Sequence, residues 1–257
     1  MTSRVEYGLG ASDVRAIAAM LDIRPTKTLG QNFVIDANTC RRIVRLAGVQ
    51  ESDHVLEVGP GLGSLTLALL SQGARVTAVE IDQVLAGELP KTIERFAAPV
   101  FKNLQVITAD ALRVTSEQLI DPTLLVANLP YNVSVPVLLT MLEIFPTIRS
   151  GVVMVQAEVA DRLAAKPNTK EYGIPSVKAA WWAEVTSAGS VSRSIFWPAP
   201  NVDSKLVGFT RRQTAGSEKK TTGGGGQPSC MGAGEDPAVG RPGGCSEGEG
   251  RKNNQGI

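Results

Sequence analysis

Histidine and cysteine are both scarce in this chain of 257 residues, and their scarcity excludes several classes of enzyme. His54 is the single histidine, so a histidine-based metal centre and a Ser-His or Cys-His hydrolase are both out of reach. The three cysteines, Cys40, Cys230 and Cys245, contain no C-x-x-C pair, and their odd number does not support a disulfide framework. We therefore expect no metal site.

Long apolar runs and a strong net charge are also missing. No segment approaches the roughly 18 apolar residues of a membrane-spanning helix, and the first ten residues hold no apolar core of the signal-peptide kind. These features predict a cytoplasmic protein without a membrane partner. The formal net charge of +1 does not by itself indicate a nucleic-acid partner, although basic residues can still cluster on one face.

Strands alternate with helices through most of the chain. This alternation predicts a doubly wound α/β fold of Rossmann-like type, with a mostly parallel sheet covered on both faces. The predicted strands are His54–Val58, Arg75–Glu80, Leu104–Thr108, Leu124–Ala127 and Gly151–Val155, and the predicted helices between them are Leu65–Ser71, Gln83–Phe96 and Val135–Phe145.

The two ends of this region carry further elements. Before it, we predict a helix from Ser12, as its N-cap, to Leu21, and a second helix that Asp36 caps and that ends at about Ala47, before Gly48. After it, Ala183–Val191 and Lys205–Thr210 are predicted as antiparallel edge strands, and Phe196–Asp203 as a proline-stiffened loop between them.

The composition changes after Arg212. Half of the 26 glycines lie between Gly216 and Gly256, and large apolar residues are almost absent there. Such a segment cannot bury enough surface to offset the entropy lost on ordering. We therefore expect a single domain over residues 1–212 and a disordered tail over residues 213–257.

A glycine-rich turn follows the first strand of the alternating region, in the run Val55-Leu-Glu-Val-Gly-Pro-Gly-Leu-Gly63. The spacing is G-x-G-x-G and not the G-x-G-x-x-G of dinucleotide sites, and the preceding acid Glu57 disfavours a pyrophosphate. Such a turn is typical of S-adenosylmethionine enzymes, in which it passes the methionine part of the cofactor. In this chain Gly59 and Gly61 are the corresponding glycines. Glu80, at the end of the second strand, can accept hydrogen bonds from both ribose hydroxyls. The alternative is a purely structural turn.

Asp110 follows the third strand, where its carboxylate can accept a hydrogen bond from the adenine amino group or serve only as a turn residue. The fourth strand ends in Asn128-Leu-Pro-Tyr131. The Asn128 side-chain oxygen and the Leu129 carbonyl can each accept one N–H bond of an exocyclic amine, whose lone pair then points towards the methyl donor. Pro130 fixes the backbone, and Tyr131 offers a ring on which a base can stack. The alternative is a stiffened turn with a buried tyrosine.

With these motifs in order, the chain resembles the ribosomal small-subunit RNA adenine N6,N6-dimethyltransferase family, whose loss gives kasugamycin resistance. The resemblance covers Arg24–Arg212 and rests on these motifs: Leu29-Gly-Gln-Asn-Phe33, Glu57–Gly63, Val79-Glu-Ile-Asp82, Asp110, Asn128–Ser134, Val155-Gln-Ala-Glu158, Tyr172-Gly-Ile-Pro-Ser176 and Phe196–Ser204. It implies S-adenosylmethionine-dependent dimethylation of two adjacent adenosines near the 3′ end of 16S rRNA, during biogenesis of the small ribosomal subunit. We expect the protein to be a monomer.

The resemblance also implies roles for individual residues. Phe196 is expected to flank the target base opposite Tyr131, with a core aromatic beside Trp197 as the alternative. The expected cofactor contacts are Gln31, Asn32, Val34, Gly59, Gly61, Glu80, Asp110 and Asn128. Two basic clusters can contact RNA phosphates or form ordinary solvated faces: Arg41, Arg42 and Arg45, and Arg162, Lys166, Lys170 and Lys178.

Three other functions remain open from the sequence. They are methylation of a 23S rRNA adenine of the macrolide-resistance type, a non-catalytic RNA-binding or ribosome-assembly role, and a nicotinamide-dependent oxidoreductase, which the glycine spacing opposes. The chain departs from the family in one respect, because its glycine-rich tail stands where members carry a small basic helical domain. We therefore expect that domain to be absent.

Overall fold

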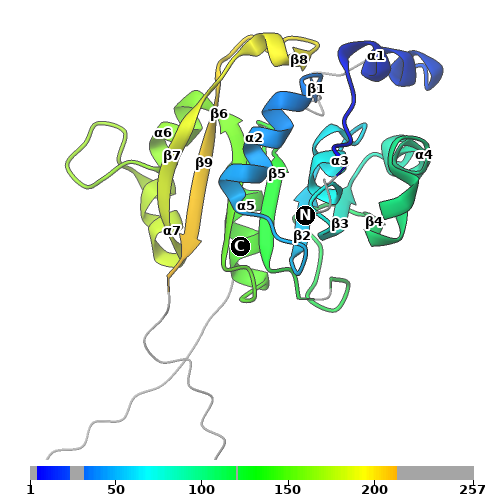
Figure 1. Ribbon diagram of the computed structural model, residues 1–257. Helices are drawn as coiled ribbons and strands as arrows, with labels where there is room; N and C mark the ends of the chain where they lie inside the picture. Colours follow the sequence, from blue (N-terminus) through cyan, green and yellow to red (C-terminus); the bar gives the residue numbers. More distant parts are fainter. Residues whose placement is uncertain (1–4, 24–31, 120, 213–257) are drawn as a thin grey trace, which may run out of the picture. The chain divides into compact units, whose positions relative to one another are not determined.

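The computed structural model of the protein describes residues 5–23, 32–119 and 121–212 (Figure 1). Its centre is a sheet of seven strands in the order β4-β3-β2-β5-β6-β9-β7. The first five in this order run parallel, and β9 pairs antiparallel with both β6 and β7. The strands are β2 (His54–Val58), β3 (Arg75–Glu80), β4 (Leu104–Thr108), β5 (Leu124–Asn128), β6 (Ser150–Gln156), β7 (Ala183–Val191) and β9 (Ser204–Arg211).

Helices cover both faces of this sheet, as Figure 1 shows. One hydrophobic cluster joins the sheet to α1 (Ala11–Met20), α2 (Ala37–Ala47), α3 (Ser64–Leu70) and α4 (Gln83–Ala97). A second cluster joins it to α5 (Ser134–Ile144), α6 (Ala157–Leu163) and α7 (Ile174–Trp182). In β2, Val55 belongs to the first cluster and Leu56 to the second, so the strand is apolar on both faces, as a central parallel strand must be. Two short 3-10 helices are also present, Ala98–Asn103 and Arg193–Ile195.

The doubly wound fold and its parallel strands are confirmed. Three of the five predicted parallel strands have the predicted bounds, and the helix capped by Asp36 is α2. The Asp36 carboxylate accepts hydrogen bonds from the backbone N–H groups of Asn38 and Thr39, and Gly48 ends the helix at φ +64°. The cap of α1 was predicted wrongly at Ser12. Gly10 takes that position, and its N–H donates to the Asp13 carboxylate at 2.9 Å.

Two predictions at the antiparallel end of the sheet need correction. β9 is not an edge strand, because it lies between β6 and β7, and only β7 is at the edge. Phe196 and Trp197 are not loop residues. They form the short strand β8 (Phe196–Trp197), which pairs antiparallel with β1 (Phe33–Val34). We call β1 and β8 together the cover ribbon. In Figure 1 the ribbon lies beyond the carboxyl ends of the parallel strands.

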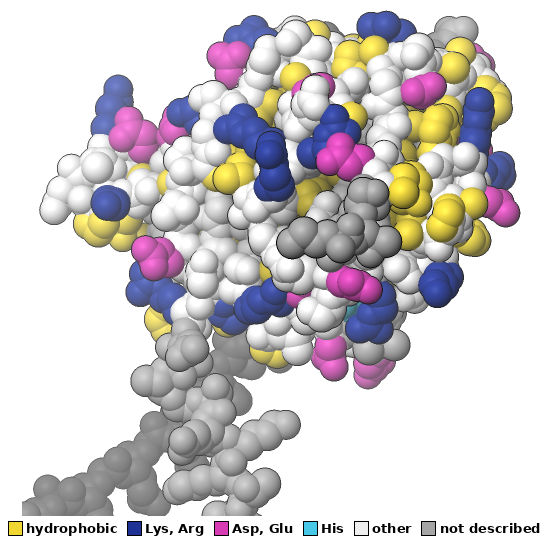
Figure 2. Space-filling model, viewed as in Figure 1, with side chains coloured by type: hydrophobic (Ala, Val, Ile, Leu, Met, Phe, Trp, Pro, Cys, Tyr) yellow, Lys and Arg dark blue, Asp and Glu magenta, His cyan; other side chains and the backbone are white. Residues whose placement is uncertain are grey.

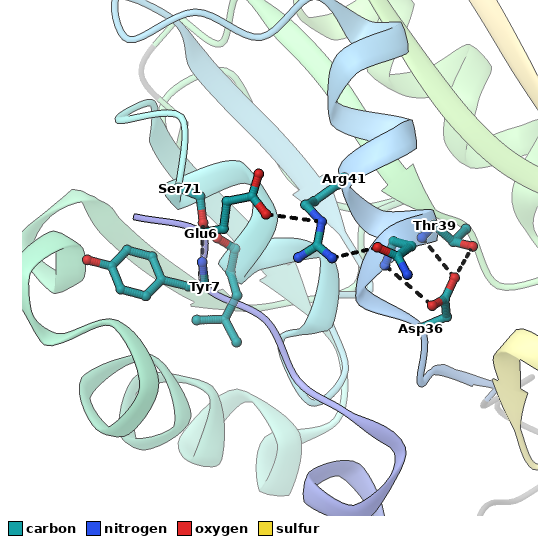
Figure 3. A network of polar contacts seen from close by, with 8 residues as sticks. Glu6, Tyr7, Asp36, Thr39, Arg41 and Ser71 are labelled. Atoms are coloured by element: carbon teal, nitrogen blue, oxygen red, sulfur yellow. Dashed lines mark hydrogen bonds and ion pairs between the residues drawn. The ribbon is translucent and has the colours of Figure 1, made fainter. Parts of the chain in front are cut away.

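The segment before α1 is attached to the helices of the first face (Figure 3). The Tyr7 N–H donates to the Ser71 hydroxyl at 2.9 Å, and the Glu6 carboxylate lies 3.4 Å from Arg41 of α2. The expected tail, residues 213–257, lies outside the described residues. Within the part of the chain that is described, no helix has the length and apolar character needed to cross a membrane.

Candidate functional site

A cavity of about 240 Å³ opens at the carboxyl ends of the parallel strands, below the cover ribbon. The sheet order reverses near this point, because β2 lies between β3 and β5, and ligands of open α/β sheets bind at such positions. Ten of the twelve residues predicted for the site line this cavity: Asn32, Val34, Gly59, Gly61, Glu80, Asp110, Asn128, Leu129, Pro130 and Tyr131.

The glycine-rich turn brings backbone to the cavity wall. Gly61 has φ +57°, and a Cβ atom at this position would lie 3.0 Å from the Phe33 ring of the cover ribbon. The N–H of Gly61 donates to the Glu80 carboxylate at 3.2 Å, and the N–H of Asp82 donates to the same carboxylate at 3.1 Å. The turn and the acid that ends β3 therefore hold each other in place, with the carboxylate at the cavity.

Two glutamates lie side by side in this wall, and burial disfavours the charged form of both. Burial raises the pKa of Glu80, although hydrogen bonds from backbone N–H groups lower it in part. Glu57 is 1% exposed and accepts a hydrogen bond from the Thr66 hydroxyl at 2.7 Å. Burial raises the pKa of Glu57 to about 8 against the effect of that hydrogen bond, and the charge of Glu80 adds to the increase. In both carboxyl groups the environment thus favours the protonated form over the charged one.

Asp110 lines the cavity after β4, and it also has local partners. Its carboxylate accepts the N–H of Leu112 at 2.9 Å and lies 3.7 Å from the Arg113 guanidinium. The turn role that the sequence left open is thus present in the structure. These contacts leave room for a ligand donor, because the Asp110 side chain is 36% exposed.

Asn128 ends β5, and only one of the two polar groups of its side-chain amide is hydrogen-bonded within the described part of the chain. The Nδ2 group donates to the Asn32 carbonyl at 3.2 Å. The Oδ1 atom is buried and has no hydrogen-bond partner among the described residues. An unpartnered buried acceptor costs free energy, on the order of 1–3 kcal/mol, unless a ligand supplies the missing donor. The next peptide is held rigidly, because the Leu129 N–H donates to the Met154 carbonyl at 3.1 Å.

Tyr131 makes one hydrogen bond through its backbone carbonyl and one through its hydroxyl. Its carbonyl accepts from the Ser134 hydroxyl at 3.4 Å, and its phenol oxygen lies 2.5 Å from the Ser204 hydroxyl. Burial raises the pKa of Tyr131 despite the hydrogen bond with Ser204, so the phenol is neutral. Ser204 had no predicted role, although it ends the quoted Phe196–Ser204 motif, because the contact joins residues 73 positions apart.

Two predicted site residues are not placed at the cavity. Phe196 is 3% exposed and belongs to the cover ribbon, where it is opposite Val34. It packs in the first hydrophobic cluster and is not among the cavity-lining residues. This position fits the alternative of a core aromatic, and the base-flanking role stays a prediction. Gln31 lies outside the described residues. Among the residues described, no group of three or more histidine, cysteine or acidic side chains is placed to hold a metal ion.

The basic clusters are partly used by the fold itself. The Arg42 guanidinium donates to the carbonyls of Ala188 and Ser190, and Arg41 pairs with Glu6. Arg162 pairs with Glu158 at 2.6 Å. Figure 2 shows Lys and Arg side chains interspersed with Asp and Glu over one face, without a single large basic patch. Arg45 and the lysines of the second cluster remain the candidates for phosphate contacts: Lys166, Lys170 and Lys178.

The chain is similar to known ribosomal RNA methyltransferases. A family model described as ribosomal RNA adenine dimethylase matches residues 24–222. Two relatives are named ribosomal RNA small subunit methyltransferase A. The protein from Streptomyces avermitilis is 62% identical over 204 residues, which cover 79% of this chain and 69% of the relative. The protein from Kineococcus radiotolerans is 60% identical over 215 residues, which cover 82% of this chain and 71% of the relative.

Two solved structures are similar as well. A dimethyladenosine transferase from Plasmodium falciparum has a TM-score of 0.62 and 28% identity, over 70% of this chain and 63% of that one. The 23S rRNA methyltransferase ErmE has a TM-score of 0.59 and 32% identity, over 70% of each chain. The present chain therefore spans less than two-thirds of the Plasmodium protein.

Proposed function

Because this chain belongs to the ribosomal RNA adenine dimethylase family, we propose that it transfers methyl groups from S-adenosylmethionine to adenine N6 in RNA. The proposed substrate is a pair of adjacent adenosines near the 3′ end of 16S rRNA, presented by the small ribosomal subunit in the cytoplasm. The observation that carries the proposal is the unpartnered Asn128 Oδ1 atom at the cavity, beside a tyrosine ring.

The cavity fits an adenosine-containing cofactor by its own chemistry. The Glu80 carboxylate can accept from two vicinal ribose hydroxyls, and the close approach at Gly61 leaves no room for a side chain. Asp110 lies one βα unit further on, where it can accept from an adenine amino group. S-adenosylmethionine supplies an electrophilic methyl group on a sulfonium when it is bound.

The residues of the Asn128–Tyr131 motif then act on the adenine amine. Asn128 Oδ1 and the Leu129 carbonyl accept its two N–H groups, so that the nitrogen lone pair is directed at the methyl donor. Tyr131 provides a flat face for the extruded base. No charged general base is required, because the amine proton can leave to solvent after the methyl group has been transferred.

The same observations bear on the alternatives. The relatives named for the small subunit share about 60% of residues with this chain, against 32% for the 23S rRNA enzyme, which favours the 16S substrate. A factor that only binds RNA has no need of a buried acceptor at the cavity.

We propose residues 1–212 as the catalytic domain and a monomer as its state in solution, which light scattering of the full chain tests.

The decisive experiment is transfer of labelled methyl from S-adenosylmethionine to unmethylated small subunits, with large subunits as the substrate control. We expect label in N6,N6-dimethyladenosine of 16S rRNA, and a loss of about 100-fold or more in Asn128→Ala. Asn103→Ala is the matched control, because its Nδ2 also donates to a backbone carbonyl, that of Gly73 at 3.3 Å, away from the cavity.

Each other outcome points to a different function. Label in large subunits alone would assign the 23S substrate. Absence of transfer, together with calorimetric binding of S-adenosylhomocysteine, would leave a non-catalytic binding role. Equal activity of Asn128→Ala and Asn103→Ala would contradict the proposed chemistry.

A further inference from the structure

Tyr131 and Ser204 meet at the rim of the site although 73 residues separate them. Their hydroxyl oxygens are 2.5 Å apart, a distance typical of a short hydrogen bond. Tyr131 lines the cavity, and Ser204 is 1% exposed and lies behind it. One member of the pair therefore faces the ligand space, and the other belongs to the protein interior.

Ser204 is paired with a neighbouring strand on each side. It is the first residue of β9, and it is opposite Gln156 of β6 on one side and Val191 of β7 on the other. The preceding residue, Asp203, accepts the N–H of Ala157 through its carbonyl at 2.8 Å and pairs with Arg193 through its carboxylate at 2.6 Å. The backbone of Ser204 therefore cannot shift without disturbing two strand ladders.

Tyr131 has far weaker backbone support. It lies in the turn between β5 and α5, where its carbonyl accepts one long hydrogen bond from Ser134 and where Val133 N–H donates to the Pro130 carbonyl at 3.2 Å. The direction of the ring thus depends on what holds its far end. Ser204 is the group that does so.

We propose that Ser204 is a positioning residue for the methyl transfer, which holds the far end of the Tyr131 ring so that the target adenine stacks in line with the methyl donor. This proposal rests on the proposed function of the same site. A ring whose far end is held before the base arrives loses less conformational freedom when the base binds. The misplacement of a reacting group by even about 1 Å is costly in rate.

The test uses Ser204→Ala, Tyr131→Phe and the double variant in the full chain, with methyl transfer to small subunits as the assay. The net worth of one such hydrogen bond corresponds to a roughly three- to tenfold loss in kcat/KM for each single variant. The double variant is expected to be no worse than Tyr131→Phe, because both single changes remove the same contact.

Ser176→Ala is the matched control. Ser176 is also 1% exposed, and its hydroxyl donates to the Arg162 carbonyl at 2.5 Å, where α7 meets α6 and not at the cavity. We expect this variant to lower the melting temperature about as much as Ser204→Ala does, and to leave kcat/KM unchanged. A loss of activity in Ser204→Ala that Ser176→Ala shares would mean a structural role only.

A second measurement separates this proposal from the function on which it rests. The chain has three tyrosines, so ring-labelled tyrosine gives a simple NMR spectrum in which Tyr131→Phe assigns one signal. Ser204→Ala is expected to shift or broaden that signal and leave the other two in place. An unchanged Tyr131 signal, or losses in kcat/KM that multiply in the double variant, would overturn the proposal. Absence of methyl transfer in the unaltered chain would refute the proposed function and not the contact.

Discussion

Replacing Gly61 by alanine tests how closely the glycine-rich turn packs under the cover ribbon, and Gly48→Ala provides the reference. Both glycines have left-handed backbones, with φ +57° and φ +64°. Around Gly48 no atom lies within 4 Å of an added Cβ, so alanine there costs only the conformational penalty of about 1–2 kcal/mol. At Gly61 the Cβ would lie 3.0 Å and 3.2 Å from two atoms of the Phe33 ring.

The Phe33 ring cannot easily yield. It is 7% exposed, its centroid lies 6.3 Å from that of Trp197 in a stacked arrangement, and its backbone pairs with β8. Overpacking of such a site costs a further 1–3 kcal/mol or so, which gives a total of about 2–5 kcal/mol for Gly61→Ala. A displaced Phe33 also moves its neighbours Asn32 and Val34, which line the cavity.

Two measurements check this prediction. Urea denaturation gives the loss of stability for each variant, and calorimetry gives the Kd of S-adenosylhomocysteine. We expect Gly48→Ala to bind like the unaltered chain and Gly61→Ala to bind at least about tenfold more weakly, a change of about 1.4 kcal/mol. If the two variants bind S-adenosylhomocysteine with equal affinity, whatever their stabilities, the close packing at Gly61 does not shape the ligand cavity and the reasoning is refuted.

Two buried acids make the stability of the fold depend on pH in opposite directions. Burial raises the pKa of Glu57 from 4.5 to about 8, so its contribution is complete below pH 4.5 and is lost as the pH rises to 8, at about 1.4 kcal/mol per pH unit. Glu57→Gln should remove this slope in urea titrations, and parallel curves for the two proteins would contradict it. Asp53 behaves in the reverse way, because hydrogen bonds from Gln50, Arg149 and others hold its pKa below 3.8 against the effect of burial. Its stabilisation is present above pH 3.8 and lost as the pH falls below it, so Asp53→Asn should cost about 1–3 kcal/mol at pH 7 and show a smaller further loss in acid. An acid transition identical to that of the unaltered chain would show that Asp53 does not contribute.

The parallel part of the fold was predictable because its signals are local. Strands such as Leu124–Asn128 are apolar runs that end at a polar residue, and buried parallel strands require that pattern. The carboxyl ends of parallel strands meet at one edge of a sheet. Residues at these ends, such as Glu80, Asp110 and Asn128, are therefore expected from the sequence alone to share a cavity, and they do.

The rest depends on contacts that no local pattern encodes. The cover ribbon pairs two strands of two residues each, Phe33–Val34 and Phe196–Trp197, and so short a strand has no periodicity to detect. The position of β9 inside the sheet is decided by tertiary pairing with β6 and β7. The helix α7 was not predicted from the sequence. Gly173 and Pro175 are typical helix breakers, although a proline in the first turn is compatible with a helix.

Asn32 and Asn128 belong to two separate sequence motifs, but in the structure the orientation of the Asn128 amide depends on Asn32. The amide of Asn128 has a donor and an acceptor, and only the acceptor suits an adenine amine. Donation from Nδ2 to the Asn32 carbonyl selects the rotamer that turns Oδ1 to its open side. A flipped amide would set Nδ2 against the N–H groups of the substrate and would lose the bond to Asn32. In the proposed function, the backbone carbonyl of Asn32, the residue that leads into β1, therefore gives the proposed methyl-acceptor site its polarity.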